Sequence, residues 1–264
     1  MNGSPTPETV AAWVRRQLVT YAPSLEKEML ALPALVRPGD VCFDVGASFG
    51  TYTVVLARLV RLGGRVHAGE PRPRSLRVLA LVNRLLTDGN VEVHPIALSD
   101  RADQEVIVTP RRRWFLPVPG RTFLKGSLEA GPQGYYPGWG EEFGGAAERV
   151  VMTQTLDGLV ADNDIDRIDF VKVDVEGAEL RVLVGAEATL VGHRPILLCE
   201  IEDRHTRKYG HGADDVFEWL RSRGYHAHVF DRRGLREVDG LLPGENNYLF
   251  LPGDGGRSCS SSCH

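Results

Sequence analysis

Short apolar runs alternate with segments of helical period along the first hundred residues of this chain. Residues 41–45 form an apolar run that ends at a glycine, and residues 65–69 and 91–94 predict two further short strands. Between them, residues 50–62 and 76–86 carry apolar side chains at spacings of three and four, the period of a helix with one buried face. This β-α-β-α-β order predicts a parallel sheet with right-handed crossovers.

The same alternation returns in the second half of the chain. The strands predicted there are residues 168–173, 195–201, 226–230 and 247–251. A helix carrying Leu183, Ala186 and Leu190 separates the first two strands, and a helix capped by Asp214 precedes the last two, which form an antiparallel hairpin. The seven strands together predict an α/β, Rossmann-like fold in which a mostly parallel sheet has helices on both faces.

Three segments fall outside this pattern. Residues 1–36 predict a short N-terminal helical extension that packs against the main domain, 37–252, or covers its ligand crevice. Residues 111–150 are rich in glycine and aromatic residues and lack a helical period, which predicts a substrate loop or lid. An extra strand over 105–109 precedes this loop. Residues 253–264 are predicted to be a disordered tail.

Composition and charge exclude several classes of function. The chain has 264 residues, 42% of them hydrophobic, and a formal net charge of -4. It lacks the clustered lysines and arginines with which proteins grip a phosphate backbone. There is no run of about 18 apolar residues and no apolar leader, so we expect a cytoplasmic protein. The expected partner is a small-molecule substrate rather than a nucleic acid or a membrane, and a homodimer is left open.

The four cysteines predict neither a disulfide framework nor a metal centre. Cys42 and Cys199 stand inside apolar runs and are interpreted as small core residues. Cys259, Cys263 and His264 would offer three ligands on a serine-rich end, which is a weak signal for a metal site. No metal ligand is therefore predicted.

The turn after the first strand predicts a nucleoside-binding site without a pyrophosphate. Gly46 permits a tight turn, and Gly50 permits close approach of the backbone to a ligand at the helix start. A dinucleotide site would need three glycines in the spacing G-x-G-x-x-G, which is absent. Asp44 would repel a diphosphate but would bind the ammonium group of a methionine moiety, directly or through water.

A second carboxylate stands at the end of the next strand. Glu70 can accept hydrogen bonds from both hydroxyls of a ribose. Leu98 and Ser99 follow the third strand, where they would contact an adenine ring and its edge. The alternative is that Asp44 and Glu70 only cap turns and that 97–100 is a plain turn. The predicted cofactor-binding residues are Asp44, Gly46, Ala47, Ser48, Phe49, Gly50, Thr51, Tyr52, Thr53, Glu70, Pro71, Leu98, Ser99 and Asp174.

Several motifs, taken together, resemble one known family. They are DVGASFGTYT, GEP, ALSD, TLDGL, IDFVKVDVEGAEL and a terminal NNYLF, spread over residues 40 to 251. This combination is similar to the FkbM family, and IDFVKVDVEGAE is its most specific part. The resemblance implies a class I methyltransferase fold, S-adenosylmethionine as cofactor, and O-methylation of a sugar, a polyketide or another secondary metabolite. Gly69, where the family commonly has an aromatic residue, and the idiosyncratic segment 111–147 leave the acceptor open.

Acidic residues gather at the ends of two neighbouring strands. The residues predicted to be catalytic are Asp174, Glu176, Glu200 and His205. In one interpretation, a carboxylate or His205 removes the proton of a substrate hydroxyl as it attacks the methyl group. In the other, Asp174 and either Glu200 or Glu202 hold Mg²⁺. The Asp-Asn pair of catechol-type enzymes is absent, which argues against the metal.

The remaining polar residues of this region are given structural roles. Glu176 and Glu179 would also favour a helix N-terminus, where acids are stabilised by the helix dipole. Lys172 is expected to pair with a neighbouring acid without a catalytic role, and His211 is interpreted as a loop residue. The alternatives to O-methylation are N-methylation of a small amine, a non-catalytic S-adenosylmethionine-binding protein and a nicotinamide oxidoreductase.

Overall fold

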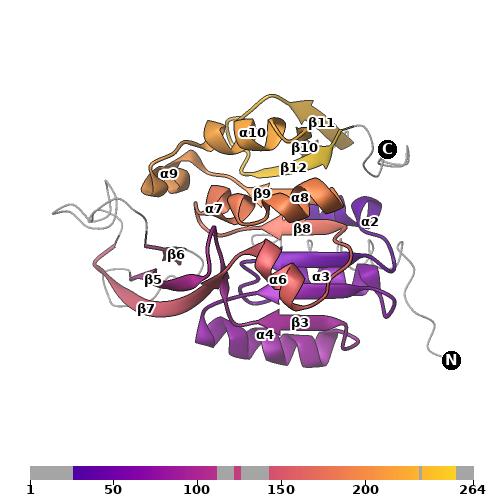
Figure 1. Cartoon of the computed structure of the whole chain (residues 1–264), viewed down its shortest axis with the longest axis horizontal. Coiled ribbons are helices and arrows are strands. Elements are labelled where there is room, and N and C mark those ends of the chain that lie inside the picture. The colour runs from indigo at the N-terminus through magenta and orange to yellow at the C-terminus, as the bar shows by residue number, and fades with distance from the viewer. Residues whose placement is uncertain (1–25, 112–121, 126–142, 232–233, 254–264) are drawn as a thin grey trace.

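The computed structural model describes residues 26–111, 122–125, 143–231 and 234–253 (Figure 1). An eight-stranded sheet runs through its centre in the order β11-β10-β12-β9-β8-β1-β2-β3. Its strands are β1 Val41–Val45, β2 Arg65–Gly69, β3 Val91–His94, β8 Phe170–Val173, β9 Ile196–Glu200, β10 Tyr225–Asp231, β11 Gly234–Val238 and β12 Asn247–Pro252. The five strands from β9 to β3 pair in parallel, whereas β10 pairs antiparallel with both β11 and β12.

Helices cover both faces of this sheet because alternate strand residues point to opposite sides. One core contains Cys42, Val66 and Leu198 and packs under η1 Lys27–Leu30, α2 Leu32–Leu35, α3 Thr51–Val60 and α4 Pro73–Leu86. The other core contains Phe43, Val171 and Leu197. It packs under α6 Leu156–Asp162, α7 Glu179–Val184, α8 Glu187–His193 and α10 Ala213–Arg221. The short α9 Asp203–Thr206 and η3 Arg207–Tyr209 follow β9.

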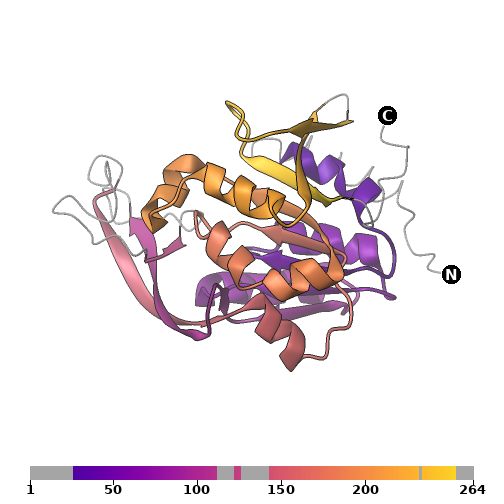
Figure 2. The same cartoon turned by 45° about the horizontal axis from the view of Figure 1, so that its top comes forward.

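A second sheet lies beyond the carboxyl ends of the parallel strands (Figures 1 and 2). Its strands, in the order β4-β7-β5-β6, are β4 Ala97–Leu98, β7 Gly145–Gln154, β5 Asp103–Arg111 and β6 Phe123–Leu124. The long antiparallel pair of β5 and β7 forms most of it. This pair places one wall of residues opposite the ends of β1, β2 and β8, which makes the second sheet part of the site described below.

The structure confirms the Rossmann-like α/β fold with helices on both faces, but the predicted strand count was too low. The connection predicted between the last two strands contains β11, and Gly234 opens this strand with a φ of 105°. The predicted helix over 183–190 is two helices, because α7 ends at Val184 and Gly185 is its C-cap. An added Cβ at Gly185 would lie 2.0 Å from the carbonyl oxygen of Ser99. The backbone at Ser99 therefore leaves no room for a larger residue at this break between the two helices.

Other boundaries also differ from the prediction. The segment predicted as a loop contains the first part of β7, whose described residues pair with β5. The helix predicted to be capped by Asp214 begins at Ala213, and Asp215 accepts the N–H of the cap residue Gly212. Residues 1–25 of the predicted N-terminal helical extension, most of the predicted lid and residues 254–264 of the predicted disordered tail lie outside the described residues. Among the residues described, no helix has the length and apolar character needed to span a bilayer.

Candidate active site

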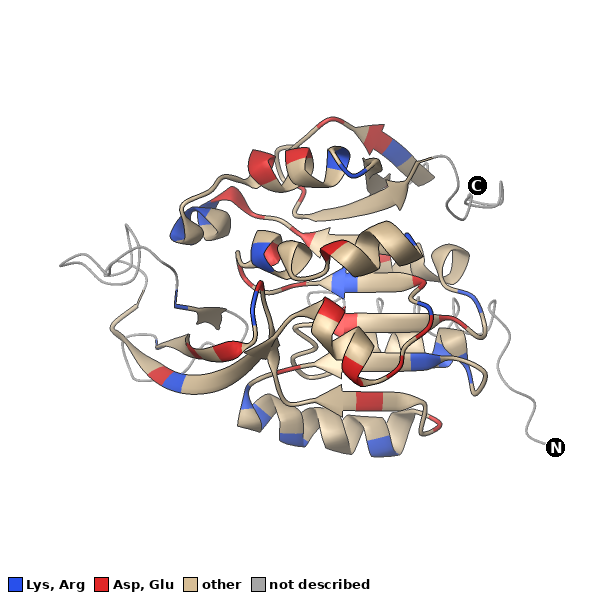
Figure 3. Cartoon of the chain, in the orientation of Figure 1, with Lys and Arg blue, Asp and Glu red and all other residues tan. Residues whose placement is uncertain are grey.

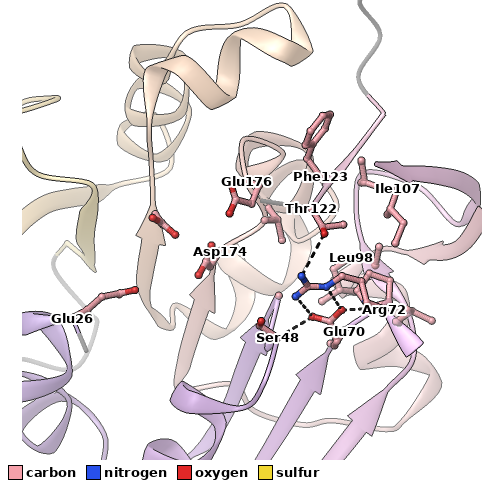
Figure 4. A pocket seen from close by; sticks show the side chains of 18 residues that line it. Glu26, Ser48, Glu70, Arg72, Leu98, Ile107, Thr122, Phe123, Asp174 and Glu176 are labelled. Atoms are coloured by element: carbon pink, nitrogen blue, oxygen red, sulfur yellow. Dashed lines mark hydrogen bonds and ion pairs between the residues drawn. The ribbon is translucent and has the colours of Figure 1, made fainter. Parts of the chain in front are cut away.

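A cavity of about 290 Å³ opens where the carboxyl ends of β1, β2, β8 and β9 meet (Figure 4). The ends of parallel strands meet at one edge of a sheet, which is where open α/β sheets bind their ligands. The second sheet closes the cavity from the other side with Ile107, Phe123 and Leu124. The other lining residues are Glu26, Gly46, Ser48, Gly69, Glu70, Pro71, Arg72, Ile96, Ala97, Leu98, Thr122, Asp174, Val175, Glu176 and Glu200.

The glycine turn after β1 holds three strand ends together. The backbone N–H groups of Gly46 and Ala47 both donate to the carbonyl oxygen of Gly69, at 3.0 Å. Gly46 has a φ of 84°, and an added Cβ would lie 1.9 Å from the carbonyl oxygen of Asp174. Gly50 has a φ of 88° and packs on Leu79 rather than facing the cavity. The need for glycine at both positions therefore comes from backbone conformation and packing.

Glu70 lies at the end of β2 with only 1% of its surface exposed. Its Oε2 accepts the N–H of Ser48 at 2.9 Å and Nη2 of Arg72 at 3.0 Å. Its Oε1 accepts the backbone N–H of Arg72 at 2.7 Å and the Nε of Arg72 at 2.8 Å. A carboxylate has about four acceptor positions, so each of those on Glu70 is used. The predicted ribose partner is thus present in the cavity but is held by a guanidinium group (Figure 4).

Asp44 lies beneath the cavity and is not among its lining residues. Thr53 donates to its carboxylate at 2.5 Å, and only 2% of Asp44 is exposed. Burial raises the pKa of Asp44 to about 6, although the hydrogen bond from Thr53 and the charge of Lys172 act in the opposite direction. The structure places Asp44 next to the site that the sequence predicted, and direct contact with an ammonium ligand stays a prediction.

A buried lysine compensates the acids at the end of β8. Lys172 is 1% exposed at its side chain, and its Nζ lies 3.5 Å from Oδ2 of Asp174. Burial lowers the pKa of Lys172, but the charges of Asp174, Glu26 and Glu200 outweigh burial and raise it. Burial raises the pKa of Asp174, but the charge of Lys172 and hydrogen bonds from Glu200 and Lys172 outweigh it and lower that pKa. The pairing predicted for Lys172 is confirmed.

Glu200 and Asp174 titrate together. Burial raises the pKa of Glu200, and the neighbouring charge of Asp174 raises it further. Glu200 therefore keeps its proton at neutral pH and donates a hydrogen bond to the ionised Asp174. The two side chains act as one unit that carries a single negative charge, which Lys172 balances.

Glu176 reaches the cavity through a tight reversal of the chain after β8. It has a φ of 57° and Gly177 a φ of 107°, and an added Cβ on Gly177 would lie 2.2 Å from the carbonyl oxygen of His205. Non-glycine residues with such φ values store strain that is typical of functional sites. The Oε2 of Glu176 lies 3.2 Å from Nδ1 of His205. Burial, followed by the charge of Asp174, raises the pKa of Glu176 to about 8.

Glu179 has the structural role that the sequence left open. Its Oε1 accepts the N–H of Gly177 at 2.9 Å and that of Val175 at 3.3 Å, so it fixes the turn that precedes α7. It is 1% exposed and is not a lining residue of the cavity. Burial raises its pKa to about 7. The turn therefore directs Glu176 into the cavity and folds Glu179 back onto the backbone.

The other predicted residues divide into two groups. Three of the four predicted catalytic residues line the cavity, and His205 contacts it through Glu176. Ser99 is fully buried and donates to Asp100 at 3.1 Å outside the cavity wall. The predicted cofactor-binding residues that line the cavity are Gly46, Ser48, Glu70, Pro71, Leu98 and Asp174. Those that do not line it are Asp44, Ala47, Phe49, Gly50, Thr51, Tyr52, Thr53 and Ser99.

Two charged lining residues were not predicted. Glu26 belongs to the segment before β1, and the hydroxyl of Tyr52 donates to its Oε2 at 2.5 Å. Nothing in the local sequence around Glu26 indicates that contact, because its partner is 26 residues away. Arg72, in contrast, follows the predicted Glu70 by two residues. This spacing in the sequence could have predicted an ion pair between Arg72 and the buried carboxylate of Glu70.

Comparisons with known proteins show the family of this chain. A family model described as the Methyltransferase FkbM domain matches residues 44–227. The chain is 34% identical over 176 residues to the 31-O-demethyl-FK506 methyltransferase FkbM of Streptomyces tacrolimicus, covering 58% of this chain and 61% of that protein. It is 29% identical over 249 residues to the AMB antimetabolite synthetase AmbE of Pseudomonas aeruginosa, covering 84% of this chain and 11% of that protein.

A solved structure, the methyltransferase FkbM from Methylobacillus flagellatus KT, is 18% identical in sequence with a TM-score of 0.48. The match covers 91% of this chain and 60% of that one. Of the two curated relatives, AmbE and the methyltransferase from Streptomyces tacrolimicus, the chain spans less than two thirds of the length of each.

Proposed function

Because the chain belongs to the FkbM family of S-adenosylmethionine-dependent methyltransferases, we propose that it methylates a hydroxyl oxygen of a small-molecule acceptor. The acceptor class that we propose is a sugar or a polyketide-type natural product. The relative from Streptomyces tacrolimicus, named as a methyltransferase of 31-O-demethyl-FK506, supports oxygen as the methylated atom. N-methylation of a small amine is the alternative, since an acidic cavity also suits a cationic acceptor.

The carboxylic lining of the cavity is the observation that carries this proposal. S-adenosylmethionine has a sulfonium and an ammonium group, both positive, and the ionised Asp174 would attract either group, since opposite charges in a partly buried site attract strongly. Arg72 is the one basic residue among the described residues that line the cavity. The carboxylic side chains that line it are Glu26, Glu70, Asp174, Glu176 and Glu200.

In the proposed reaction, each acid of the centre has a separate task. The cofactor supplies an electrophilic methyl group and leaves as S-adenosylhomocysteine. Glu176 accepts the hydroxyl proton as the new oxygen–carbon bond forms, because a pKa of about 8 makes it a competent base near neutral pH. Asp174 stays ionised and, with the protonated Glu200, would stabilise the positive sulfonium group of a bound cofactor. His205 positions Glu176 by its contact with Oε2.

We propose that this reaction needs no Mg²⁺. A divalent ion at Asp174 and Glu200 would have to displace the proton they share and would stand beside the ammonium group of Lys172. Repulsion between two cations at that distance opposes metal binding. Lys172 therefore already balances the charge of this acid pair without a metal ion.

Cofactor binding and methyl transfer are tested directly with the purified chain. We expect S-adenosylhomocysteine to bind in calorimetry, NADH to show no heat, and methyl-labelled S-adenosylmethionine to label hydroxyl acceptors in a panel of sugars and polyketides. Labelling should persist in excess EDTA. Labelling of amines alone would replace O-methylation by N-methylation, and loss of turnover in EDTA would contradict the proposed role of Lys172. Cofactor binding without turnover on the whole panel would favour a non-catalytic binding protein.

Ribose binding by Glu70 requires Arg72 to release it. The two backbone N–H donors can stay, but the guanidinium occupies the remaining two acceptor positions that ribose hydroxyls would need. In Arg72→Met, cofactor binding no longer has to break this ion pair, so we expect S-adenosylhomocysteine to bind about 10-fold more tightly by calorimetry. The cofactor-free variant should unfold with a free energy about 2 kcal/mol lower, because Glu70 loses a charged partner.

The matched control for this change is Arg84→Met, an exposed arginine on the same helix. It should alter neither cofactor affinity nor the free energy of unfolding measurably. Weaker cofactor binding by Arg72→Met would show that the guanidinium contacts the bound cofactor rather than competing with it.

A further inference from the structure

A groove lined by arginine residues adjoins the acidic cavity. It has a volume of about 770 Å³, in the range of small-molecule sites, and lies between the start of α4 and the β5–β7 pair. Among the described residues, its walls contain one acidic residue, Glu148, which is paired with Lys125 at 3.1 Å. The arginines that line it are Arg72, Arg74, Arg77, Arg111 and Arg149. Figure 3 shows basic residues on the first turns of α4 and on β7.

Two elements present these arginines to the same space. Arg74 and Arg77 are three positions apart on α4, so they share one face of the helix. On the opposite wall, Arg149 stands directly across from Ile107 in the β5–β7 register, and Arg111 follows Ile107 by four residues. Residues at even spacing on a strand, and residues directly opposite across an antiparallel pair, point to the same side of a sheet. Both strand arginines therefore lie on the face turned to the groove.

Four of these guanidinium groups have no carboxylate partner within the described residues. Arg74, Arg77, Arg111 and Arg149 make no ion pair there, whereas Arg181, outside the groove, pairs with Asp100 at 2.6 Å and with Glu105 at 2.5 Å. Unbalanced like charges destabilise a fold by repulsion. A chain with a net charge of -4 has acids available to neutralise them. Their concentration in one concave site indicates an anionic ligand.

We propose that this groove binds the phosphate group of a phosphorylated acceptor. Guanidinium groups match phosphate oxygens with paired hydrogen bonds, and the N-terminus of the 14-residue α4 adds its positive dipole end. Arg72, Ile107 and Thr122 line both the groove and the acidic cavity. A ligand held by its phosphate in the groove can thus extend along β5 towards the methyl-transfer site. The identification of the ligand as the acceptor rests on the proposed function, but phosphate binding itself does not.

Calorimetric titration of the full chain with inorganic pyrophosphate tests the groove. We expect saturable binding to the unmodified chain. The dissociation constant should be at least 10-fold larger in the double variant Arg74→Ala/Arg77→Ala and in the single variant Arg149→Ala. These side chains are exposed and come from opposite walls, so the fold tolerates each change. Arg84→Ala, on the same helix but outside the groove, should bind pyrophosphate within 2-fold of the unmodified chain.

S-adenosylhomocysteine binding is measured on the same samples and should be unchanged in all variants. If the chain binds pyrophosphate but not S-adenosylhomocysteine, the proposed function fails while the phosphate groove stands. No pyrophosphate binding, or equal binding by the groove variants, overturns the groove. Titration with citrate tests whether the groove prefers phosphates to carboxylates. Citrate binding as tight as that of pyrophosphate would overturn the assignment of a phosphate.

Discussion

Gly46→Ala is expected to lower the free energy of unfolding by about 4 kcal/mol or more and to abolish cofactor binding. Two costs combine at this position. A side chain at a φ of 84° costs about 1–2 kcal/mol, and the added Cβ would lie 1.9 Å from the backbone oxygen of Asp174. That oxygen cannot move aside without shifting the end of β8, because the N–H of Asp174 donates to Val45 at 3.0 Å. Denaturant unfolding measures the loss.

Gly89→Ala is the matched control for this change. Gly89 also has a positive φ, 76°, but nothing lies within 4 Å of an added Cβ there. This substitution should lower the free energy of unfolding by about 1 kcal/mol, the cost of a side chain at positive φ, and should leave cofactor affinity unchanged. Equal losses in the two variants would mean that φ alone explains the glycine at position 46. The close contact between the turn and β8 would then not be what shapes the site.

The predicted strands and helices of the first half match the structure because their signal is local. Each of β1, α3 and β2 buries its own apolar positions, so the pattern appears within ten residues. β7 gives no such signal, since Val150 and Met152 are exposed and its stability comes from pairing with β5, about 40 positions earlier. Of this pair, the sequence predicted a strand over 105–109, within β5, but not its partner β7.

The candidate site divides in the same way. Acids at the carboxyl ends of strands were predictable because parallel topology brings those ends together. The separate roles of Glu176 and Glu179 were not, because both follow one strand and both suit a helix start. The left-handed backbone at Glu176 and Gly177 decides between them. Arg72 shows the same limit: the sequence indicates a cation near Glu70, but the four occupied acceptor positions appear only in three dimensions.

The charge distribution would let the two proposed sites serve one reaction. Among the described lining residues, acidic side chains outnumber basic ones in the inner cavity, which would suit a cationic cofactor, whereas arginines outnumber acidic side chains in the adjoining groove, which would suit an anionic ligand. Opposite potentials in adjoining sites favour one occupant each and disfavour exchange between them. Arg72 lies at the boundary and belongs to both, tied to Glu70 on one side and 3.4 Å from Thr122 on the other.

Glu176→Gln is expected to reduce the rate of methyl transfer by about 10²–10³-fold at pH 8. A base works only when ionised, and Glu176 has a pKa of about 8, so the rate of the unmodified enzyme should rise with pH up to about 8 and then level off. The amide cannot accept the proton, so this rising limb should disappear in the variant. The pH dependence of kcat measures both effects.

Glu179→Gln provides the control for this pH profile, because it also removes a buried carboxylate with a raised pKa from the same turn. Its carboxylate bonds only the turn backbone, so the variant should lose stability but keep the rising limb in its pH profile. If the rising limb persists in Glu176→Gln and vanishes in Glu179→Gln, Glu176 is not the base. If the limb persists in both variants, the titrating group is neither glutamate, and His205 becomes the group to substitute next. The result thus distinguishes chemistry at Glu176 from a titration that merely loosens the turn.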